Sequence, residues 1–290
     1  MSNDLTSAAE KRLAAVLDRL GPIAIAVSGG VDSMTLAFLA HRRGGPVEMV
    51  HALSPAVPPE ATARVRHHAA RFGWMLQIIS AAEFEDPHYL RNPVNRCFFC
   101  KTNLYTRIAS LTSRRIASGA NLDDLDDYRP GLLAAAEHNV AHPFIEASID
   151  KPMVRRLAAR HGLDDLAELP AQPCLSSRIE TGIGIDARDL AFVHAVETAV
   201  RNDLTAGNIR CRVTREGIVL ELEPYDDMQA DRAAGIAARL AHEAGRRFAG
   251  VRPYRRGSAF IGKPGTDESR PGWRMSPESG PGFGTKARAK

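Results

Sequence analysis

The sequence predicts an α/β protein in which a parallel sheet is followed by a smaller α+β domain. Short apolar runs alternate with helix-like segments through the first half of the chain, a pattern typical of a parallel sheet covered by helices. The stretch SGGVDS stands where one apolar run gives way to a helix-like segment. After Pro173 the order changes to helix, two successive strands and helix. We therefore expect domains at 1–172 and 173–261 and a tail at 262–290.

The individual elements follow from apolar periodicity and from glycine and proline punctuation. The N-terminal stretch MSNDLTSAAEKRLAAVL is typical of a capped amphipathic helix. In the first half we expect strands at Ile23–Val27, Val47–Leu53, Leu76–Ile79 and Arg115–Ser118, and helices around 33–43, 60–72, 99–111 and 152–161. In the second half we expect helices around 186–202 and 226–244, strands at Ile209–Thr214 and Ile218–Glu223, and short β-like pieces within 247–261.

Composition and charge predict a globular protein and argue against membrane and nucleic-acid partners. With 44% apolar and 25% charged residues among 290, the chain has the composition of a soluble globular protein. No apolar run reaches membrane-spanning length and the N-terminus is unlike a signal peptide, so we expect a cytoplasmic location and no membrane partner. The net charge is +4, but the tail contributes +3 of it. The remaining chain is nearly neutral, which argues against a nucleic-acid partner, and the tail, rich in glycine and proline, is predicted to be disordered.

SGGVDS has the features of an anion site. The first amides of a helix point outward without partners and carry partial positive charge, so a strand–turn–helix junction attracts phosphate. Gly29 and Gly30 allow close approach of the backbone, while Ser28 and Ser33 add hydroxyl donors. The lysine of a standard P-loop is missing. An ordinary glycine turn is the alternative.

The cysteines point to metal or nucleophilic chemistry. Four cysteines in a chain of this length do not make a secreted disulfide framework. Cys97 and Cys100 form a CxxC pair beside Arg96 and Lys101, and such a pair can chelate one metal or cluster. Two small buried side chains on a helix are the alternative. Cys174 lies in a polar, proline-rich loop, where the alternative is a bystander thiol.

Three further groups of charged residues are candidates for ligand binding. Arg210 and Arg212 project from one face of a strand, as a phosphate or carboxylate clamp requires, whereas Cys211 between them points into the core. A solvated edge face is the alternative, and the same ambiguity applies to PYRRGS at 253–258. The acidic run from Asp123 to Asp127 suits Mg²⁺ on a triphosphate, or it is merely a solvated loop.

Taken together these motifs resemble a known family. SGGVDS is similar to the loop of PP-loop ATP pyrophosphatases (adenine nucleotide alpha hydrolase-like), which split ATP between the α and β phosphates and adenylate a substrate. NPVNRCFFCK, GANLDDLDDYRPG, PCLSSRIETG and YRRGS, in this order, resemble the LarE group of that superfamily. The resemblance runs from about residue 20 to 260. It implies a Rossmann-like PP-loop domain with a C-terminal domain for substrate and sulfur transfer.

The resemblance also implies roles for particular residues. ATP would be bound by Asp32, which is also a catalytic candidate, and by seven further residues of the first domain. These are Ser28, Gly29, Gly30, Ser33, Gly119, Asn121 and Asp124. Cys174 would handle sulfur, and the substrate would meet Arg178, Arg210, Arg212 and Arg255. Two departures stand out: Ser118 replaces a frequent aspartate, and YRRGS replaces the commoner YRSGS.

The implied reaction is thiolation of a carboxylate. ATP would adenylate a carboxylate of pyridinium biscarboxylic acid mononucleotide, and sulfur from a sulfide or other donor would displace AMP, as a step in nickel-pincer nucleotide synthesis for lactate racemase. Within the family a lone cysteine sacrifices its sulfur, or three cysteines hold a [4Fe–4S] cluster. We expect the cluster, on Cys97, Cys100 and Cys174, because a sacrificial mechanism leaves the CxxC pair unexplained.

Three alternatives remain at this stage. A tRNA thiolation enzyme uses similar ATP and cysteine chemistry, but the nearly neutral core argues against tRNA. A zinc-stabilised ATP-binding module without catalysis would use Cys97 and Cys100 as structural ligands, and a Cys₃His zinc site completed by His142 or His161 competes with iron. The expected cofactors are thus ATP, Mg²⁺ and a [4Fe–4S] cluster, and we expect a homo-oligomer.

Overall fold

The structure is a computed structural model that describes residues 2–126, 129–204, 207–255 and 257–259. The predicted tail at 262–290 lies outside these residues. The helices are α1 (Ser2–Leu20), α2 (Val31–Arg42), α3 (Pro59–Phe72), α4 (Pro87–Leu90), α5 (Arg96–Ala109), α6 (Pro130–Glu137), α7 (Pro143–Glu146), α8 (Lys151–Arg160), α9 (Asp164–Ala167), α10 (Ala187–Asp203) and α11 (Asp227–Glu243). The strands are β1 (Ile23–Ala26), β2 (Val47–Leu53), β3 (Leu76–Ser80), β4 (Arg115–Ala117), β5 (Asn208–Thr214), β6 (Gly217–Glu223) and β7 (Phe248–Pro253).

The first half of the chain forms a four-stranded, entirely parallel sheet in the order β3-β2-β1-β4. Ile25 of β1 pairs with Met49 of β2 on one side and with Ala117 of β4 on the other. All four carboxyl ends therefore lie at one edge of the sheet, where ligands bind in open α/β folds. This confirms the predicted α/β class with a parallel sheet.

Helices cover both faces of this sheet, as the alternating pattern predicts. One face contributes Ile25 and Met49 to a core that includes residues of α1, α2 and α8. The opposite face contributes Ala24 and Val50 to a smaller core with residues of α5 and α6. Strands buried on both faces have to be apolar almost throughout, which is why they were visible as continuous apolar runs.

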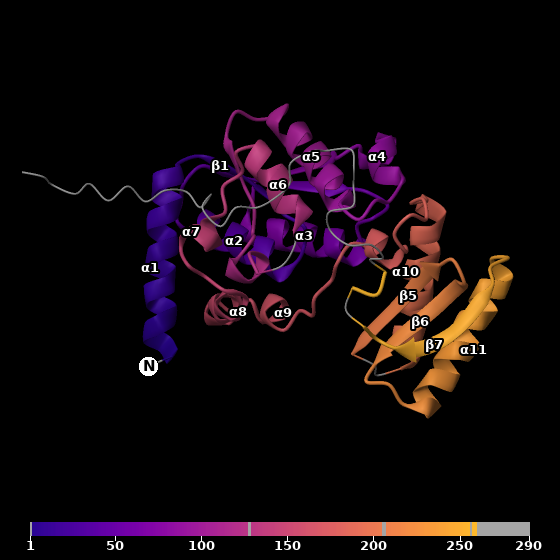
Figure 1. The fold of residues 1–290 in the computed structure, drawn as a ribbon. Helices are drawn as coiled ribbons and strands as arrows, with labels where there is room; N and C mark the ends of the chain where they lie inside the picture. The colour runs from indigo at the N-terminus through magenta and orange to yellow at the C-terminus, as the bar shows by residue number, and fades with distance from the viewer. Residues whose placement is uncertain (1, 127–128, 205–206, 256, 260–290) are drawn as a thin grey trace, which may run out of the picture.

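The second half forms a mixed three-stranded sheet in the order β5-β6-β7. β5 and β6 are an antiparallel hairpin, and β7 joins β6 in parallel after the long helix α11. One face of the hairpin packs against α10 and α11 through residues such as Ile209, Cys211 and Leu220. Figure 1 shows this sheet at one end of the molecule and α1 at the opposite end.

The two halves share buried contacts. The core of the second sheet includes Ala56 and Tyr89, which belong to the first half of the chain. Buried Asn92 donates from Nδ2 to the carbonyls of Glu180 and Ile183, both at 2.9 Å. The predicted boundary at residue 173 is therefore crossed by a continuous apolar core, and the division into domains stays a prediction.

The elements differ from expectation mainly at their ends. α5 begins at Arg96 rather than near 99, which places both cysteines of the CxxC pair inside the helix. The β-like signal within 247–261 becomes a single strand, β7. Four helices of four to eight residues, α4, α6, α7 and α9, were not predicted. Among the described helices, none combines the length and apolarity needed to cross a bilayer.

Candidate active site

The predicted phosphate loop lies at the carboxyl edge of the parallel sheet. Residues 27–30 connect β1 to α2, and Gly30 is the residue that caps the helix N-terminus. The Ser33 hydroxyl lies 3.1 Å from the Ser28 hydroxyl and accepts from the Ser28 amide at 3.0 Å. These contacts hold the loop in shape, while the unpartnered first amides of α2 make the junction suitable for an anion.

Two glycines in this region are required by close packing. Gly29 has φ +83°, and a Cβ there would come within 2.6 Å of the Ala61 carbonyl oxygen on α3. A Cβ on Gly119 would lie 2.6 Å from the Ser33 amide nitrogen and 2.8 Å from the Asp32 carbonyl carbon. The loop after β4 therefore presses directly on the backbone of the phosphate loop. An ordinary glycine turn requires neither approach.

Asp32 is held by residues from two distant segments. Its carboxylate forms an ion pair with Lys151 at the start of α8 and accepts from Asn121 Nδ2 at 3.2 Å. Asp32 and Lys151 remain about 30% exposed, so the pair can open at little energetic cost. Lys151 supplies, from far along the sequence, the cation that the loop itself lacks. Sequence reasoning missed it, although a lysine in the first turn of a helix opposes the helix dipole and is a detectable signal.

The acidic run is only partly available for Mg²⁺. Asn121 and Asp124 form a reciprocal cap, with the Asn121 amide donating to Asp124 at 3.1 Å, and Asp124 also pairs with Arg129. Asp123 and Asp126 are exposed, and Asp127 lies outside the described residues. The oxygen-rich donor set suits Mg²⁺. Asp123 and Asp126 are the carboxylates available to a metal–triphosphate complex, and Asp32 would join them once its pair with Lys151 opens.

Ser118, the first departure from the family pattern, has a local partner. Its hydroxyl lies 2.9 Å from His142 Nδ1, and residue 141 forms a β-bridge with Ala117. Burial lowers the pKa of His142, which favours the neutral ring. The carboxyl end of β4 therefore carries a neutral Ser–His pair.

Cys174 is exposed at the end of an irregular, largely exposed stretch, residues 169–174, which we call the Cys174 segment. Immediately after it, the Leu175 amide donates to the Ala56 carbonyl at 2.9 Å, just beyond the carboxyl end of β2. The loop that bears Cys174 therefore folds back over the strand ends of the parallel sheet. Cys174 and the phosphate loop lie at the same edge of the parallel sheet.

Arg178 holds this thiol-bearing loop in place. Its Nε and Nη2 donate to the two carboxylate oxygens of Glu197, each at 2.9 Å. Its Nη1 donates to the Pro173 carbonyl at 2.7 Å and to the Cys174 carbonyl at 3.2 Å. All three guanidinium nitrogens thus bind groups of the protein, and Arg178 orients the loop that bears Cys174. The predicted contact of Arg178 with substrate stays a prediction. Glu197 was missed, although a carboxylate in the apolar stripe of α10 was a usable signal.

The three candidate thiols influence one another. Burial raises the pKa of Cys97, and the nearby Cys174 raises it further, while Arg96, Lys101 and Arg129 act in the opposite direction. Burial raises the pKa of Cys100 to about 12, with contributions from Cys174 and Cys97. Burial therefore favours the protonated forms of Cys97 and Cys100.

This environment bears on the expected cluster. Three neighbouring sulfurs beside cations are a donor set that fits iron–sulfur ligation, which requires thiolates. In the described part of the chain, however, no three His, Cys, Asp or Glu side chains are already grouped tightly enough to hold a metal ion. Cys100 also packs against the second core, in line with the alternative of a small buried side chain.

Arg210 and Arg212 share a face of β5 but differ in their partners. Both are more than 90% buried, so the alternative of a solvated face is wrong, and Cys211 is fully buried on the other face as predicted. Arg212 donates from Nε to Glu221 at 2.8 Å and from Nη1 to the Ser177 carbonyl at 2.9 Å. Arg210 has no ion pair with any carboxylate of the described residues.

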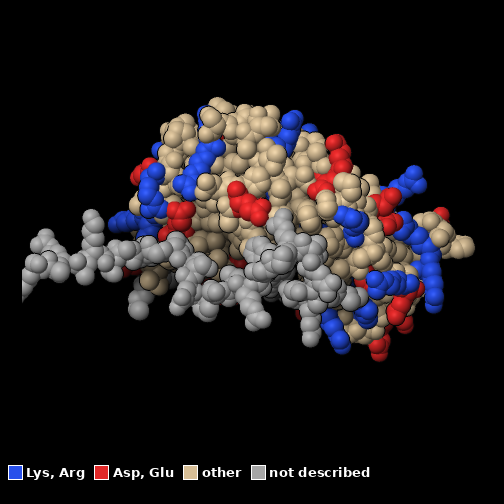
Figure 2. All heavy atoms as spheres, turned by 45° about the horizontal axis from the view of Figure 1, so that its top comes forward, with Lys and Arg blue, Asp and Glu red and all other residues tan. Residues whose placement is uncertain are grey.

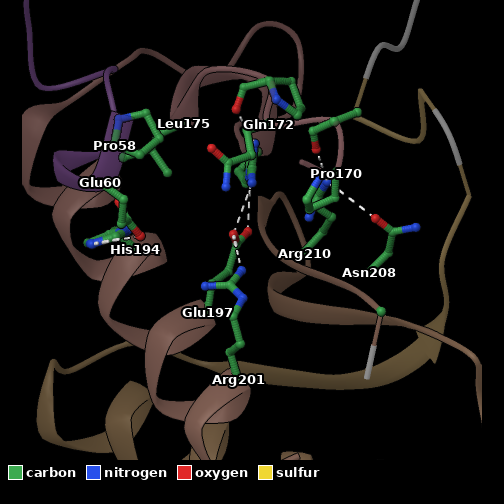
Figure 3. Close-up of a pocket in the computed structure, with 14 residues that line it drawn as sticks. Pro58, Glu60, Pro170, Gln172, Leu175, His194, Glu197, Arg201, Asn208 and Arg210 are labelled. Carbon is green, nitrogen blue, oxygen red and sulfur yellow. Dashed lines mark hydrogen bonds and ion pairs between the residues drawn. The ribbon is translucent and has the colours of Figure 1, made fainter. Parts of the chain in front are cut away.

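Arg210 faces a small pocket between the two halves of the chain (Figure 3). The pocket has a volume of about 70 Å³, enough for a phosphate-sized group but not for a whole nucleotide. Arg210 Nη2 donates to the Ala171 carbonyl at 3.2 Å, and its guanidinium lies 5.8 Å from the Tyr254 ring centre. Burial and the charge of Arg178 lower the pKa of Arg210, as expected for an uncompensated cation.

Glu221 is the centre of a buried network that sequence reasoning missed. Besides Arg212, it accepts from Arg252 Nη2 at 2.9 Å and from the Ser258 hydroxyl at 3.0 Å. It therefore ties the PYRRGS stretch to β5. Arg255, the remaining predicted substrate residue, is exposed, and Arg256 lies outside the described residues.

Positive and negative side chains are mixed on the surface that Figure 2 shows. On the face in Figure 2, the visible Lys and Arg side chains are interspersed with Asp and Glu rather than gathered in one band. This agrees with the nearly neutral core calculated from the sequence.

The fold and site define an α/β protein with a Rossmann-like PP-loop domain and a smaller C-terminal region. No family model matches the chain. The uncharacterized protein slr1717 of Synechocystis sp. is 36% identical over 210 residues, covering 71% of this chain and 78% of that protein. The uncharacterized protein MJ0830 of Methanocaldococcus jannaschii is 27% identical over 210 residues, covering 71% and 79%.

A third relative carries a functional name. The pyridinium-3,5-bisthiocarboxylic acid mononucleotide synthase of Lactiplantibacillus plantarum is 29% identical over 196 residues, covering 66% of this chain and 71% of that protein. The chain therefore belongs to the family of these proteins, which is a LarE-like family.

Proposed function

We propose that this protein is an ATP-dependent sulfur transferase acting on a pyridinium biscarboxylic acid mononucleotide in nickel-pincer nucleotide synthesis. The observation that carries the proposal is the Leu175–Ala56 hydrogen bond, which brings the exposed Cys174 to the sheet edge that bears SGGVDS. ATP activation and sulfur chemistry require such neighbouring sites. The name of the Lactiplantibacillus plantarum relative, which specifies a bisthiocarboxylic acid mononucleotide, supports this substrate class.

The first step is adenylation of a carboxylate. The amides at the start of α2 and the Ser28 and Ser33 hydroxyls would bind the phosphates of ATP, with Mg²⁺ neutralising part of their charge. A carboxylate oxygen of the substrate attacks the α-phosphorus and pyrophosphate leaves. Lys151, released from Asp32, would stabilise the charge that develops on the departing pyrophosphate.

The second step replaces oxygen by sulfur. A free carboxylate does not react with a thiolate, but the acyl adenylate has a good leaving group. Sulfur attacks the acyl carbon, and AMP departs with the former carboxylate oxygen, which leaves a thiocarboxylate. Arg210, a buried cation without a carboxylate partner in the described chain, is suited to hold the phosphate of the mononucleotide during both steps.

For the sulfur source we propose a [4Fe–4S] cluster on Cys97, Cys100 and Cys174. When bound, three-thiolate ligation leaves one iron able to carry a transferable sulfide. Arg96 and Lys101 flank the pair in α5 and favour the thiolate forms that ligation requires. The competing mechanism sacrifices the sulfur of Cys174 alone.

The activity is tested by incubating the anaerobically purified protein with ATP, sulfide and pyridinium biscarboxylic acid mononucleotide. We expect AMP and pyrophosphate in equal amounts and a product whose mass reflects replacement of oxygen by sulfur. Thiolation of tRNA instead would favour the tRNA enzyme. ATP binding without any pyrophosphate release would favour a non-catalytic module.

The cluster is tested independently of activity, by iron and sulfide content and the visible spectrum. We expect Cys97→Ala, Cys100→Ala and Cys174→Ala each to lose iron, while Cys211→Ala, the matched control, retains it. Loss of H₂S from Cys174 after a single turnover, with full activity in Cys97→Ala, would establish the sacrificial mechanism instead. Zinc in place of iron would support a structural site.

A further inference from the structure

The Cys174 segment has no regular secondary structure and is fixed largely by arginines. Pro170 through Cys174 are all exposed, so packing contributes little to their position. Three arginines from α8, β5 and the turn after Cys174 bind its carbonyls. The bonds are Arg155 Nη2 to Leu169 at 2.7 Å, Arg210 Nη2 to Ala171 at 3.2 Å, and Arg178 Nη1 to Pro173 at 2.7 Å.

A fourth arginine connects this segment to the phosphate loop. Arg64 of α3 donates from Nη1 to the Gly29 carbonyl at 2.7 Å and to Gln172 Oε1 at 3.3 Å. Burial lowers the pKa of Arg64, while the charges of Asp165 and Glu60 act in the opposite direction. Neither of these carboxylates, both in the described part of the chain, forms an ion pair with Arg64. A half-buried cation whose hydrogen bonds go to two different loops is placed to hold them together.

The phosphate loop transmits its position to Arg64 through Gly29. This residue has φ +83° and is pressed against Ala61 of the same helix, so its carbonyl cannot turn without altering the bond to Arg64. The amides that would bind phosphate belong to the same short loop, residues 28–30 and the start of α2. Occupation of the loop by phosphate therefore acts directly on the group that Arg64 binds.

We propose that Arg64 is a positioning residue that couples occupancy of the phosphate loop by ATP to the exposure of Cys174. The inference rests on the proposed function for the identity of ATP as the loop's ligand. Through Gly29, Arg64 and Gln172, binding of ATP sets where the Cys174 segment lies. The position of the sulfur-handling residue is then linked to the presence of the activating nucleotide.

The test measures alkylation of Cys174 by iodoacetamide in the full-length protein after any bound iron has been removed with a chelator, because a ligated thiolate would not react. Peptide mass spectrometry separates the four cysteines. The probe is an ATP analogue that resists cleavage between the α and β phosphates, and its affinity is measured in parallel by calorimetry. We expect the analogue to change the labelling rate of Cys174 at least about fivefold, the lower end of typical coupling between sites.

Two variants at residue 64 and one matched control separate coupling from general damage. Arg64→Gln is expected to bind the analogue yet lose its effect on Cys174 labelling, and Arg64→Lys to recover part of the effect. Arg71→Gln removes an exposed arginine from the far end of the same helix and is expected to behave as wild type.

Each outcome decides the inference. An unchanged labelling rate in the wild-type protein that binds the analogue would overturn it, as would a full nucleotide effect in Arg64→Gln. Failure of the wild-type protein to bind the analogue would overturn the proposed ATP-dependent function as well, so the two failures are distinguishable.

Discussion

Charged residues lie both at the carboxyl edge of the parallel sheet and on the face of the three-stranded sheet that bears Arg210 and Arg212, which we call its inner face. The two places differ in how far the charges are buried and paired. At the sheet edge, the pair of Asp32 and Lys151 is about 30% exposed and can exchange its partner for a ligand. On the inner face, Arg212 and Glu221 are locked in a buried pair. Residue type alone therefore does not mark a binding group. What matters is whether a partner already satisfies its charge.

The largest effect should come from breaking the exposed pair. Asp32→Ala is expected to lower pyrophosphate release by at least about a hundredfold, the usual result of removing a preorganised charged group from a reaction centre. Stability should change by no more than about 1 kcal/mol, because the pair is partly exposed. Pyrophosphate release and urea unfolding measure the two quantities, with Asp231→Ala on the exposed face of α11 as the control. Undiminished turnover would remove Asp32 from the site.

Breaking the buried pair should act on stability instead. Removing one partner of a buried ion pair typically costs about 3–5 kcal/mol of unfolding free energy. For Arg212→Ala this is an upper limit, because Glu221 keeps its bonds to Arg252 and Ser258. Urea unfolding of this variant and of Glu221→Gln measures the loss. A stable Arg212→Ala variant with a raised KM for the mononucleotide would return Arg212 to the role of a substrate clamp.

Arg210→Ala should affect substrate binding rather than stability, unlike Arg212→Ala on the same strand. Losing a charge-assisted contact typically costs about 1.5–3 kcal/mol, so KM for the mononucleotide should rise about ten- to a hundredfold. KM for ATP should be unchanged, and stability should not fall as it does for Arg212→Ala, because no carboxylate loses its partner. Steady-state kinetics with each substrate varied in turn separates these effects. An equal rise in both KM values would contradict the assignment.

The smallest expected effect is a loss of unfolding free energy at acid pH, through the histidine that binds the backbone next to the phosphate loop. His51 Nδ1 lies 2.8 Å from the Val27 carbonyl and Nε2 lies 2.9 Å from the Thr62 hydroxyl, and burial lowers the pKa of this histidine. The neutral ring is favoured in the folded state, while the unfolded chain takes up a proton below about pH 6.5. Stability is therefore complete above that pH and falls as the pH drops, by at most about 1.4 kcal/mol per unit.

Urea unfolding between pH 7 and 5 measures this slope. His51→Gln should flatten it, whereas His67→Gln, at an exposed position of α3, should leave it unchanged. The same slope in both variants would assign the acid sensitivity to other groups.

Much of the architecture was predictable because it depends on local patterns. β1 and β2 are short, mostly apolar runs bounded by glycine, proline or serine, and the longer helices are amphipathic or capped. The short helices α4, α6, α7 and α9 were missed because four to eight residues are too few to display a helical period. The motif-bearing loops were located correctly, since a parallel sheet gathers its carboxyl ends at one edge.

The pairing of charges was not predictable in the same way. Arg210 and Arg212 look equivalent in sequence, and the strand register places Glu221 directly opposite Arg210. The carboxylate nevertheless binds Arg212, its diagonal neighbour, while Arg210 turns toward Ala171. Arg252 and Ser258 approach Glu221 from segments distant in sequence. Pairings set by distant segments cannot be predicted from local sequence. For the same reason the pairing of Lys151 with Asp32 was not predictable, although the unusual place of a lysine in the first turn of a helix was visible.

Asn92, whose amide binds two carbonyls across the junction between the halves of the chain, has a consequence for dissecting this protein. A gene cut at codon 172 would produce two fragments, each presenting apolar surface and unpaired backbone groups that the other normally covers. Neither fragment would be a self-sufficient building block for transplantation into another enzyme. Produced together in one cell, however, the two fragments have complementary apolar surfaces from one shared core, and they are suited to associate without a peptide bond between them.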